Sequence, residues 1–214
     1  KAVLEKIAAS PVRIQLVDGL RNLLVPGVTR RLQNEYSCLA DAYKTAEPVE
    51  GTSLALFSLA SGIVDRAIPM ESLRATTVWS DGLPEAETVL SEQAYASFLA
   101  NQSPSAPPPR RGVRATYALT ADLTLAPESS RRWMIVADIG RSQSEVATLC
   151  VALRKGGHAA AVLGAADDST RRLRALVGSA DGLQTGGDEI ATAHHFANTL
   201  FNIMRGGVFA RHHE

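Results

Sequence analysis

The sequence predicts an α+β protein in which strands and short helices fill the earlier part of the chain and helices fill the last part. Segments 72–81 and 112–125 are rich in residues that suit a pleated surface or alternate apolar with polar residues, as strands do. Segments 141–158 and 188–205 instead carry apolar residues three to four positions apart, the spacing of one helical face. With 45% hydrophobic residues among 214, the chain can bury a core.

The first hundred residues predict short elements of both kinds. Strands are expected at 12–17, 53–67 and 72–81, with a turn at 68–71. A helix is expected within 28–48, where four apolar side chains fall on one face: Leu32, Tyr36, Leu39 and Tyr43. A second helix is expected at 90–101, with Ser91 as the N-cap and an apolar stripe of Ala94, Tyr95, Phe98 and Leu99.

The remaining residues predict a loop, two strands and a series of helices. Residues 101–111 contain three consecutive prolines and predict a loop, followed by a half-buried strand at 112–125 and a more deeply buried strand at 131–140. Ser142 and Glu145 have capping-box spacing at the start of the helix 141–158. A strand at 159–164 and helices at 167–182 and 188–205 complete the set.

Composition excludes several classes of function. Lys plus Arg equals Asp plus Glu at 22 each, so no net field attracts nucleic acid or an anionic membrane surface. No apolar run reaches the 18 to 20 residues or so that would span a bilayer, and the first residues lack the hydrophobic core of a signal peptide. Cys38 and Cys150 lack metal-ligand spacing and predict buried free thiols. We therefore expect a cytoplasmic protein without nucleic-acid or membrane partners.

Local motifs for common enzyme classes are weak. Residues 133–164 predict a strand, helix and strand, as in a nucleotide-binding unit, but the turn DIGRSQSE has one glycine where the dinucleotide fingerprint has three. An α/β packing unit without ligand is the preferred interpretation. His194 and His195 are adjacent, and so are His212 and His213, so neither pair shares a helical face for a metal ion. We expect no metal and no cofactor.

The most suggestive polar residues lie between 65 and 79: Asp65, Arg66, Glu71, Arg74 and Trp79. An indole near carboxylate and guanidinium groups can stack against a sugar and bond its hydroxyls. The alternatives are that Trp79 belongs to the core or an interface and that Asp65 and Arg66 form an ion pair at a strand end.

Six phrases, in this order, carry a resemblance to a known family: IQLVDGLRNLLVPGV (14–28), LADAYK (39–44), SGIVDRAIPMESLRATTVW (61–79), WMIVADIGRSQSE (133–145), SADGLQ (179–184) and FANTLFNIMRGGVF (196–209). Together they resemble the amino-terminal half of the large bacterial proteins related to cellobiose phosphorylase, among them the β-1,2-oligoglucan phosphorylases. The resemblance covers almost the whole chain, although no single phrase is a catalytic signature.

The resemblance implies an architecture and a parent reaction. It implies a β-sandwich with inserted helices at 1–138, a mixed packing region at 139–187, and a linker helix at 188–214 that leads toward an α/α barrel outside this chain. The family cleaves β-glucosidic bonds of gluco-oligosaccharides by inverting phosphorolysis, with inorganic phosphate as co-substrate and a carboxylic acid that protonates the leaving oxygen. Its acid and phosphate-binding residues belong to the barrel, so we expect this chain to be inactive alone.

The resemblance also implies surfaces and partners. Arg66 and Trp79 are candidates for contact with a glycan or an interface, and Leu200, Phe201 and Met204 for a helix face toward the barrel. A homodimer is a further expectation. Two rival interpretations remain: an independent Rossmann-like α/β binding module without catalysis, and a free-standing carbohydrate-binding sandwich. The second needs an exposed aromatic platform, for which only Trp79 and Trp133 are available.

Overall fold

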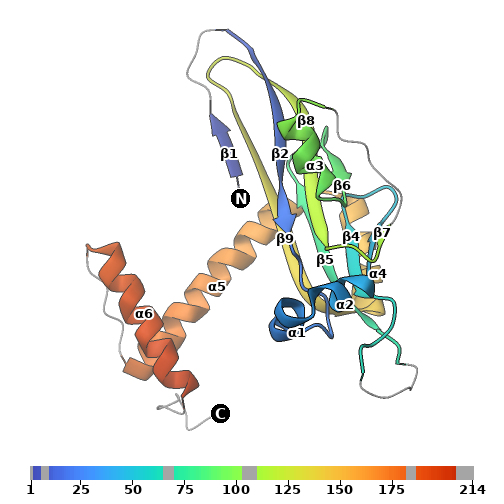
Figure 1. Ribbon diagram of the computed structural model, residues 1–214. Helices are drawn as coiled ribbons and strands as arrows, with labels where there is room; N and C mark the ends of the chain where they lie inside the picture. The colour runs from blue at the N-terminus through green and yellow to red at the C-terminus, as the bar shows by residue number, and fades with distance from the viewer. Residues whose placement is uncertain (1, 6–9, 65–69, 103–109, 182–186, 206–214) are drawn as a thin grey trace. The chain divides into compact units, whose positions relative to one another are not determined.

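The computed structural model describes residues 2–5, 10–64, 70–102, 110–181 and 187–205 (Figure 1). It is a mixed α+β structure with two antiparallel sheets and several helices. The chain divides into two compact units, Lys1–Gly156 and Gly157–Glu214. This division differs from the predicted boundaries at 138 and 187, because the helix after the last strand groups with the sheets. Gly156 and Gly157 at the junction both have positive φ, 72° and 79°.

The first unit contains both sheets. The six-stranded sheet has the order β1 (Ala2–Glu5), β9 (Ser130–Ser142), β5 (Arg74–Asp81), β4 (Ala55–Leu59), β3 (Lys44–Pro48) and β7 (Arg110–Arg111). The three-stranded sheet has the order β2 (Val12–Arg21), β8 (Thr116–Leu125) and β6 (Glu87–Val89). Every strand pair is antiparallel.

The two sheets contribute to one hydrophobic cluster. Phe57 and Val78 from the six-stranded sheet and Tyr117 from the three-stranded sheet are each 0% exposed within it. Two side-chain hydrogen bonds also connect the sheets or their loops: the Tyr117 hydroxyl donates to the carbonyl of Ser53 at 2.8 Å, and Trp133 Nε1 donates to Asp18 Oδ2 at 2.7 Å. Burial and hydrogen bonding therefore act together in the core.

Residues 116–121 of β8 are covered on both faces, whereas Asp122 and Thr124 further along the strand are exposed. Tyr117, Leu119, Ala121 and Leu123 point into the shared cluster, whereas Ala118 packs with Val89, Ala94 and Tyr95 of a second cluster on the opposite face. Helix α3 (Gln93–Leu99) supplies the last two of these residues. Gly19 of β2 pairs with Ala118 of β8. A side chain at position 19 would prevent this close packing, since its Cβ would lie 2.1 Å from the carbonyl oxygen of Tyr117.

Two short helices stand between β2 and β3. In α1 (Arg30–Glu35), the Thr29 hydroxyl accepts from the backbone N–H of Leu32 at 3.1 Å, and α2 (Ser37–Ala42) follows after a break at Tyr36, where φ is −132° and ψ is 46°. The expected single helix face is therefore wrong: Tyr36, Leu39 and Tyr43 are exposed, and Gln33 and Ala40 are buried instead. The chain enters β3 directly after Tyr43.

Helix α4 (Gln143–Lys155) begins with the predicted capping box. The Ser142 hydroxyl accepts from the N–H of Glu145, and the Glu145 carboxylate accepts from the Ser142 backbone at 2.7 Å. These bonds from Ser142 favour the ionised carboxylate and hold the pKa of Glu145 below its usual value. The helix ends at Gly156, as predicted.

The second unit contains α5 (His158–Asp181) and α6 (Glu189–Met204), which contact each other. The predicted strand at 159–164 is wrong, because α5 runs through it and through the expected helix at 167–182 without interruption. Residues 159–161 are all alanine, the residue with the highest helix propensity, and only Val162 in the segment is β-branched. Helix α6 confirms the prediction at 188–205 to within a residue at each end.

The strand predictions at 72–81, 112–125 and 131–140 are confirmed by β5, β8 and β9, and the one at 12–17 by the longer β2. Of 53–67, only β4 is a strand, and residues 65–69 lie outside the described part. Helix α3 confirms 90–101, where Ser91 Oγ accepts from the N–H of Gln93 although Glu92 takes the cap position. Strands β1, β3, β6 and β7 were not predicted, and β3 occupies the last residues of the segment 28–48 that was expected to be helical.

Several burial expectations are wrong. Leu99 is 83% exposed, so it lies outside the apolar stripe of α3. Strand β9 is deeply buried only at Trp133 and Met134, and Ile139 is 68% exposed. Cys38 is exposed, and Cys150 is intermediate. Among the helices that the structure describes, none has the length and apolar content needed to cross a bilayer.

We expect Tyr117→Phe to destabilise the first unit, because it removes the hydroxyl that bonds the Ser53 carbonyl and contacts Ser80 Oγ at 3.1 Å. A loss of about 1–2 kcal/mol in the free energy of unfolding is expected. Urea unfolding followed by the fluorescence of Trp79 and Trp133, both in this unit, measures it. The control Tyr36→Phe, at a ring 58% exposed, should change stability by less than about 0.5 kcal/mol.

The same substitution should change the alkaline limb of stability. Burial raises the pKa of Tyr117 above its ordinary value near 10. The neutral phenol is thus favoured in the folded state, and stability should fall as pH rises above the unfolded pKa toward the folded one. Tyr117→Phe should flatten part of this decline. An equal loss in Tyr117→Phe and Tyr36→Phe, or an unchanged alkaline limb, would contradict the role assigned to the hydroxyl.

Candidate functional site

Helix α6 presents the most distinctive surface of the second unit. Its N-terminus is fixed by Asp188, whose Oδ1 accepts from the N–H groups of Ile190 at 2.9 Å and Ala191 at 3.3 Å. The negative charge of Glu189 in the first turn interacts favourably with the helix dipole. Hydrogen bonds and charge therefore both stabilise the N-terminus of α6.

One face of α6 belongs to the interior of the second unit. Thr199 and Ile203 on α6 and Val177 on α5 are its buried residues within the described part of the chain. They fit the contact between α5 and α6. The buried side of α6 is therefore narrow and centred on Thr199 and Ile203.

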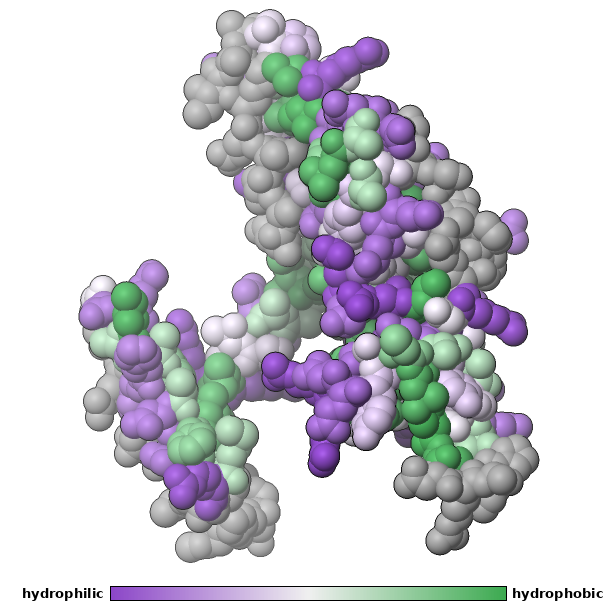
Figure 2. All heavy atoms as spheres, viewed as in Figure 1, coloured by the Kyte–Doolittle hydropathy of each residue, from purple (hydrophilic) through white to green (hydrophobic). Residues whose placement is uncertain are grey.

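The other apolar side of α6 is exposed. It comprises Ile190, Ala193, Ala197, Phe201 and Met204, spaced three or four residues apart, and we call it the α6 apolar face. Ile190 is 69%, Phe201 50% and Met204 77% exposed. The only charged contact recorded on it is the guanidinium of Arg205, 5.3 Å from the centre of the Phe201 ring. In Figure 2, hydrophobic side chains, in green, reach the surface along α5 and α6.

Two of the three residues predicted for a partner-facing surface lie on this face. Phe201 and Met204 are exposed, whereas Leu200 is half-buried beside Thr199, and contact with a barrel stays a prediction. Aromatic and Met side chains are enriched at protein interfaces, and a continuous exposed apolar stripe is characteristic of a docking surface. The geometry can bind another apolar element but offers no group for chemistry.

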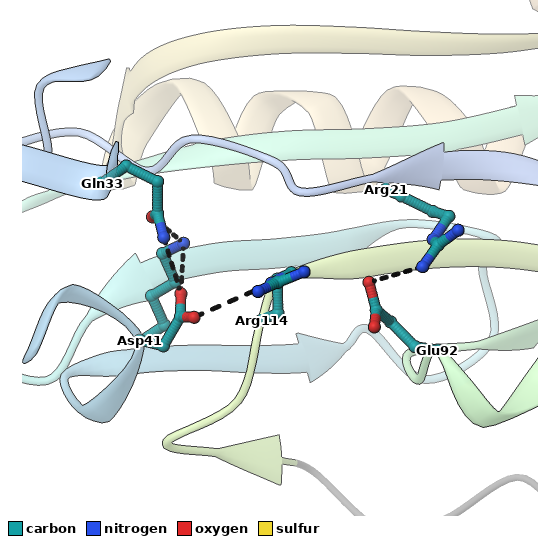
Figure 3. Close-up of polar contacts among 6 residues, drawn as sticks. Arg21, Gln33, Asp41, Glu92 and Arg114 are labelled. Atoms are coloured by element: carbon teal, nitrogen blue, oxygen red, sulfur yellow. Dashed lines mark hydrogen bonds and ion pairs between the residues drawn. The ribbon is translucent and has the colours of Figure 1, made fainter. Parts of the chain in front are cut away.

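A buried charged cluster in the first unit was not predicted (Figure 3). The Lys44 side chain is 1% exposed, and its Nζ donates to Asp41 Oδ1 at 2.8 Å and to Gln33 Oε1. Gln33 Nε2 also donates to Asp41 Oδ1 at 3.2 Å, and Arg114 Nε lies 3.9 Å from Asp41 Oδ2. These contacts join α1 and α2 to β3. Because the two recorded partners of the Lys44 ammonium, Asp41 and Gln33, lie on neighbouring helices, we call this arrangement a structural clasp.

A second polar contact in Figure 3 secures α3. Arg21 Nη2 lies 3.2 Å from Glu92 Oε1, and its guanidinium lies 5.3 Å from the centre of the Tyr95 ring. Burial, assisted by the nearby Asp18 carboxylate, raises the pKa of Tyr95. The contact is partly exposed and holds the start of α3 over β2.

The sequence also gave no indication of a groove that we call the sheet groove. It has a volume of about 300 Å³ and lies over the exposed face of the three-stranded sheet, lined by Gln15, Leu16, Val17, Glu85, Glu87, Phe98, Gln102, Thr120, Ala121 and Asp122. These residues come from β2, β6, β8 and α3 and their flanks. No local motif contains them, since only the register of three strands brings them together.

The other predicted site residues are Asp65, Arg66 and the two tryptophans. Arg66 and Asp65 lie outside the described residues. Trp79 is 5% exposed and pairs across β5 and β9 with Val136, so its burial favours the core alternative, and a glycan or interface contact stays a prediction. Trp133 is equally buried, which leaves neither tryptophan as an exposed platform. Among the described residues no cluster of metal-ligating side chains occurs.

The predicted strand–helix–strand order of residues 133–164 is wrong. Strand β9 is antiparallel to both of its neighbours, β1 and β5, and the segment expected as the second strand belongs to α5. A dinucleotide site requires parallel strands connected by the helix. The structural basis for an independent Rossmann-like binding module is therefore removed.

Comparison with known proteins leaves the family open. No protein-family model matches the chain. No curated protein shows significant similarity to it.

We expect Lys44→Met to destabilise the first unit by about 3 kcal/mol, because it leaves the Asp41 carboxylate, only 15% exposed, without its near cation. Urea unfolding measures the change. The double variant Lys44→Met/Asp41→Leu should recover part of the loss, since no unpaired charge remains. Arg31→Met is the control: Arg31 bonds Glu35 at the surface with a side chain 83% exposed, and a change below about 1 kcal/mol is expected. Equal effects of Lys44→Met and Arg31→Met would contradict the clasp.

Proposed function

We propose that this chain is a non-catalytic region of a carbohydrate-active, glycoside phosphorylase-like enzyme, and that the α6 apolar face docks it onto the catalytic α/α barrel. The observation that carries the proposal is the position of that face. Ala197, Phe201 and Met204 lie within FANTLFNIMRGGVF, the phrase of the resemblance that belongs next to the barrel. Their exposure is what a partner-facing helix requires.

The spacing of the face supports a helical partner. Side chains at i±3 and i±4 form ridges that fit the grooves of another helix. The small residues Ala193 and Ala197 lie between the larger Ile190 at one end and Phe201 and Met204 at the other, so the stripe has a shallow middle between two raised ends. Helices of an α/α barrel present complementary surfaces. A second copy of this chain is the alternative occupant, and the experiment below separates the two.

The proposal extends to the arrangement of the two antiparallel sheets. We propose that the two antiparallel sheets form the β-sandwich of such an enzyme. The shared cluster around Phe57, Val78 and Tyr117 supports this, as do the hydrogen bonds from Tyr117 to Ser53 and from Trp133 to Asp18. Facing sheets of a sandwich bury their inner side chains in one layer. The six-stranded and three-stranded sheets would then differ in their outer faces.

In the proposed parent reaction, inorganic phosphate attacks the anomeric carbon of a β-linked glucose unit while a carboxylic acid protonates the leaving oxygen, with inversion. The barrel supplies the acid and the phosphate-binding groups. The contribution of the present chain is mechanical: its helix face and sheets support the barrel, and they supply none of the reacting groups.

The test begins with the complete product of the reading frame that encodes this chain. With inorganic phosphate and β-linked gluco-oligosaccharides, we expect phosphate-dependent release of a glucose phosphate by the whole product. The 214-residue chain alone should give none. Turnover by the chain alone, or phosphate-independent release of glucose by the whole product, would contradict the proposed reaction.

The docking surface is tested by Phe201→Asp/Met204→Asp. Placing carboxylates in a buried apolar contact should lower the melting temperature of the whole product by several degrees and reduce its activity. The control is Asn202→Asp, an exposed polar neighbour on the same helix, which should leave both unchanged. If the chain alone self-associates and the double substitution abolishes only that, the second-copy alternative replaces the barrel.

A further inference from the structure

The outer face of the three-stranded sheet is half covered by α3, and the sheet groove is the part that α3 leaves open. Ala118 and Val89 lie beneath α3, where they pack with Ala94. One cross-strand row further, Val17 on β2, Thr120 on β8 and Glu87 on β6 lie side by side. In the next row, Gln15 pairs with Asp122. The floor of the groove is therefore a regular two-row surface.

One wall of the groove is aromatic and amide-bearing. Phe98, in the last turn of α3, is 37% exposed and lines the groove together with Gln102 just beyond the helix. Phe98 thus offers part of its ring to a ligand while α3 remains anchored through Ala94 and Tyr95. An aromatic ring held by a packed helix is a rigid surface for a ligand with an apolar side.

The floor of the groove and Gln102 on its wall together carry hydrogen-bonding groups of both kinds. Asp122 and Glu87 supply carboxylate acceptors, and Gln15 and Gln102 supply amide donors as well as acceptors. Glu85 is also acidic, but Arg131 bonds its carboxylate and holds its pKa below the usual value. A carboxylate already paired in this way adds little attraction for a second cation.

We propose that the sheet groove binds a short stretch of a neutral oligosaccharide. A sugar ring has an apolar C–H side and an edge of hydroxyls that both donate and accept. The groove supplies the aromatic contact at Phe98 and a mixed set of donors and acceptors at Gln15, Gln102 and Asp122. A volume of about 300 Å³ matches the lower end of small-molecule sites and suits one or two sugar units.

A cationic ligand is the main alternative, because the carboxylates of Glu87 and Asp122 give the groove a negative potential. A protonated polyamine, however, only donates hydrogen bonds, so the two amide donors would have no acceptor in such a ligand. The mixed chemistry of the groove favours the sugar. The choice of β-linked glucose as the sugar rests on the function proposed above, whereas the preference for a polyol rests on the groove alone.

The experiment is a titration of the 214-residue chain with cello-oligosaccharides and with β-1,2-linked gluco-oligosaccharides, without phosphate, followed by calorimetry and amide chemical shifts. We expect saturable binding in the millimolar range, with shifts concentrated at Val17, Glu87, Phe98 and Thr120. Phe98→Ala should weaken binding about tenfold. The matched control is Leu99→Ala, since Leu99 is 83% exposed on the same helix and does not line the groove.

A second variant, Gln15→Ala, removes an exposed amide and should weaken binding without changing the melting temperature. Absence of glucan binding, equal effects of Phe98→Ala and Leu99→Ala, or saturation of the groove by spermine but by no glucan would each overturn the proposal. Because binding is measured on this chain without phosphate, its outcome is independent of whether the whole product performs phosphorolysis.

Discussion

The structure of the first unit depends on the burial of residues 116–121 of β8 on both faces of the strand. Residues at alternate positions of a strand point to opposite sides, so a strand in the interior must be apolar at successive positions. Tyr117 and Leu119 fill the core shared by the two sheets, and Ala118 between them supports α3. A shift of one residue in register would exchange these two sets and place the Tyr117 ring beneath α3.

Polar groups in this unit make the apolar arrangement specific. The Tyr117 hydroxyl bonds the Ser53 carbonyl and contacts Ser80 Oγ, the Trp133 indole donates to Asp18, and Lys44 forms an ion pair with Asp41. Nonpolar packing tolerates many arrangements of similar volume, whereas an unpaired buried polar group is costly. The hydrogen bonds therefore select one alignment of sheets and helices among those that the apolar residues allow.

The extent to which the sequence predicted the fold follows the strength of local patterns. Helix α4 was predicted with its cap because Ser142 and Glu145 carry the full capping interaction within four residues. Strand β6 has only three residues, Glu87–Val89, too few for a visible alternation. Segment 159–164 was mistaken for a strand because a short apolar run has no period that separates strand from buried helix. The prediction of a single helical face within 28–48 was wrong because a break at Tyr36 divides the segment into two short helices.

The two candidate surfaces also differ in whether a local sequence pattern could predict them. The residues of the α6 apolar face could be recognised in the sequence because residues three and four positions apart lie on the same side of a helix. The sheet groove could not, since Gln15, Glu87 and Asp122 are far apart in the chain and meet only through strand pairing. Their chemistry also differs: one surface excludes polar partners, and the other carries donors, acceptors and one partly exposed ring. Because the two surfaces lie on separate units and share no side chains, a ligand bound at one would not compete with a partner at the other for the same residues.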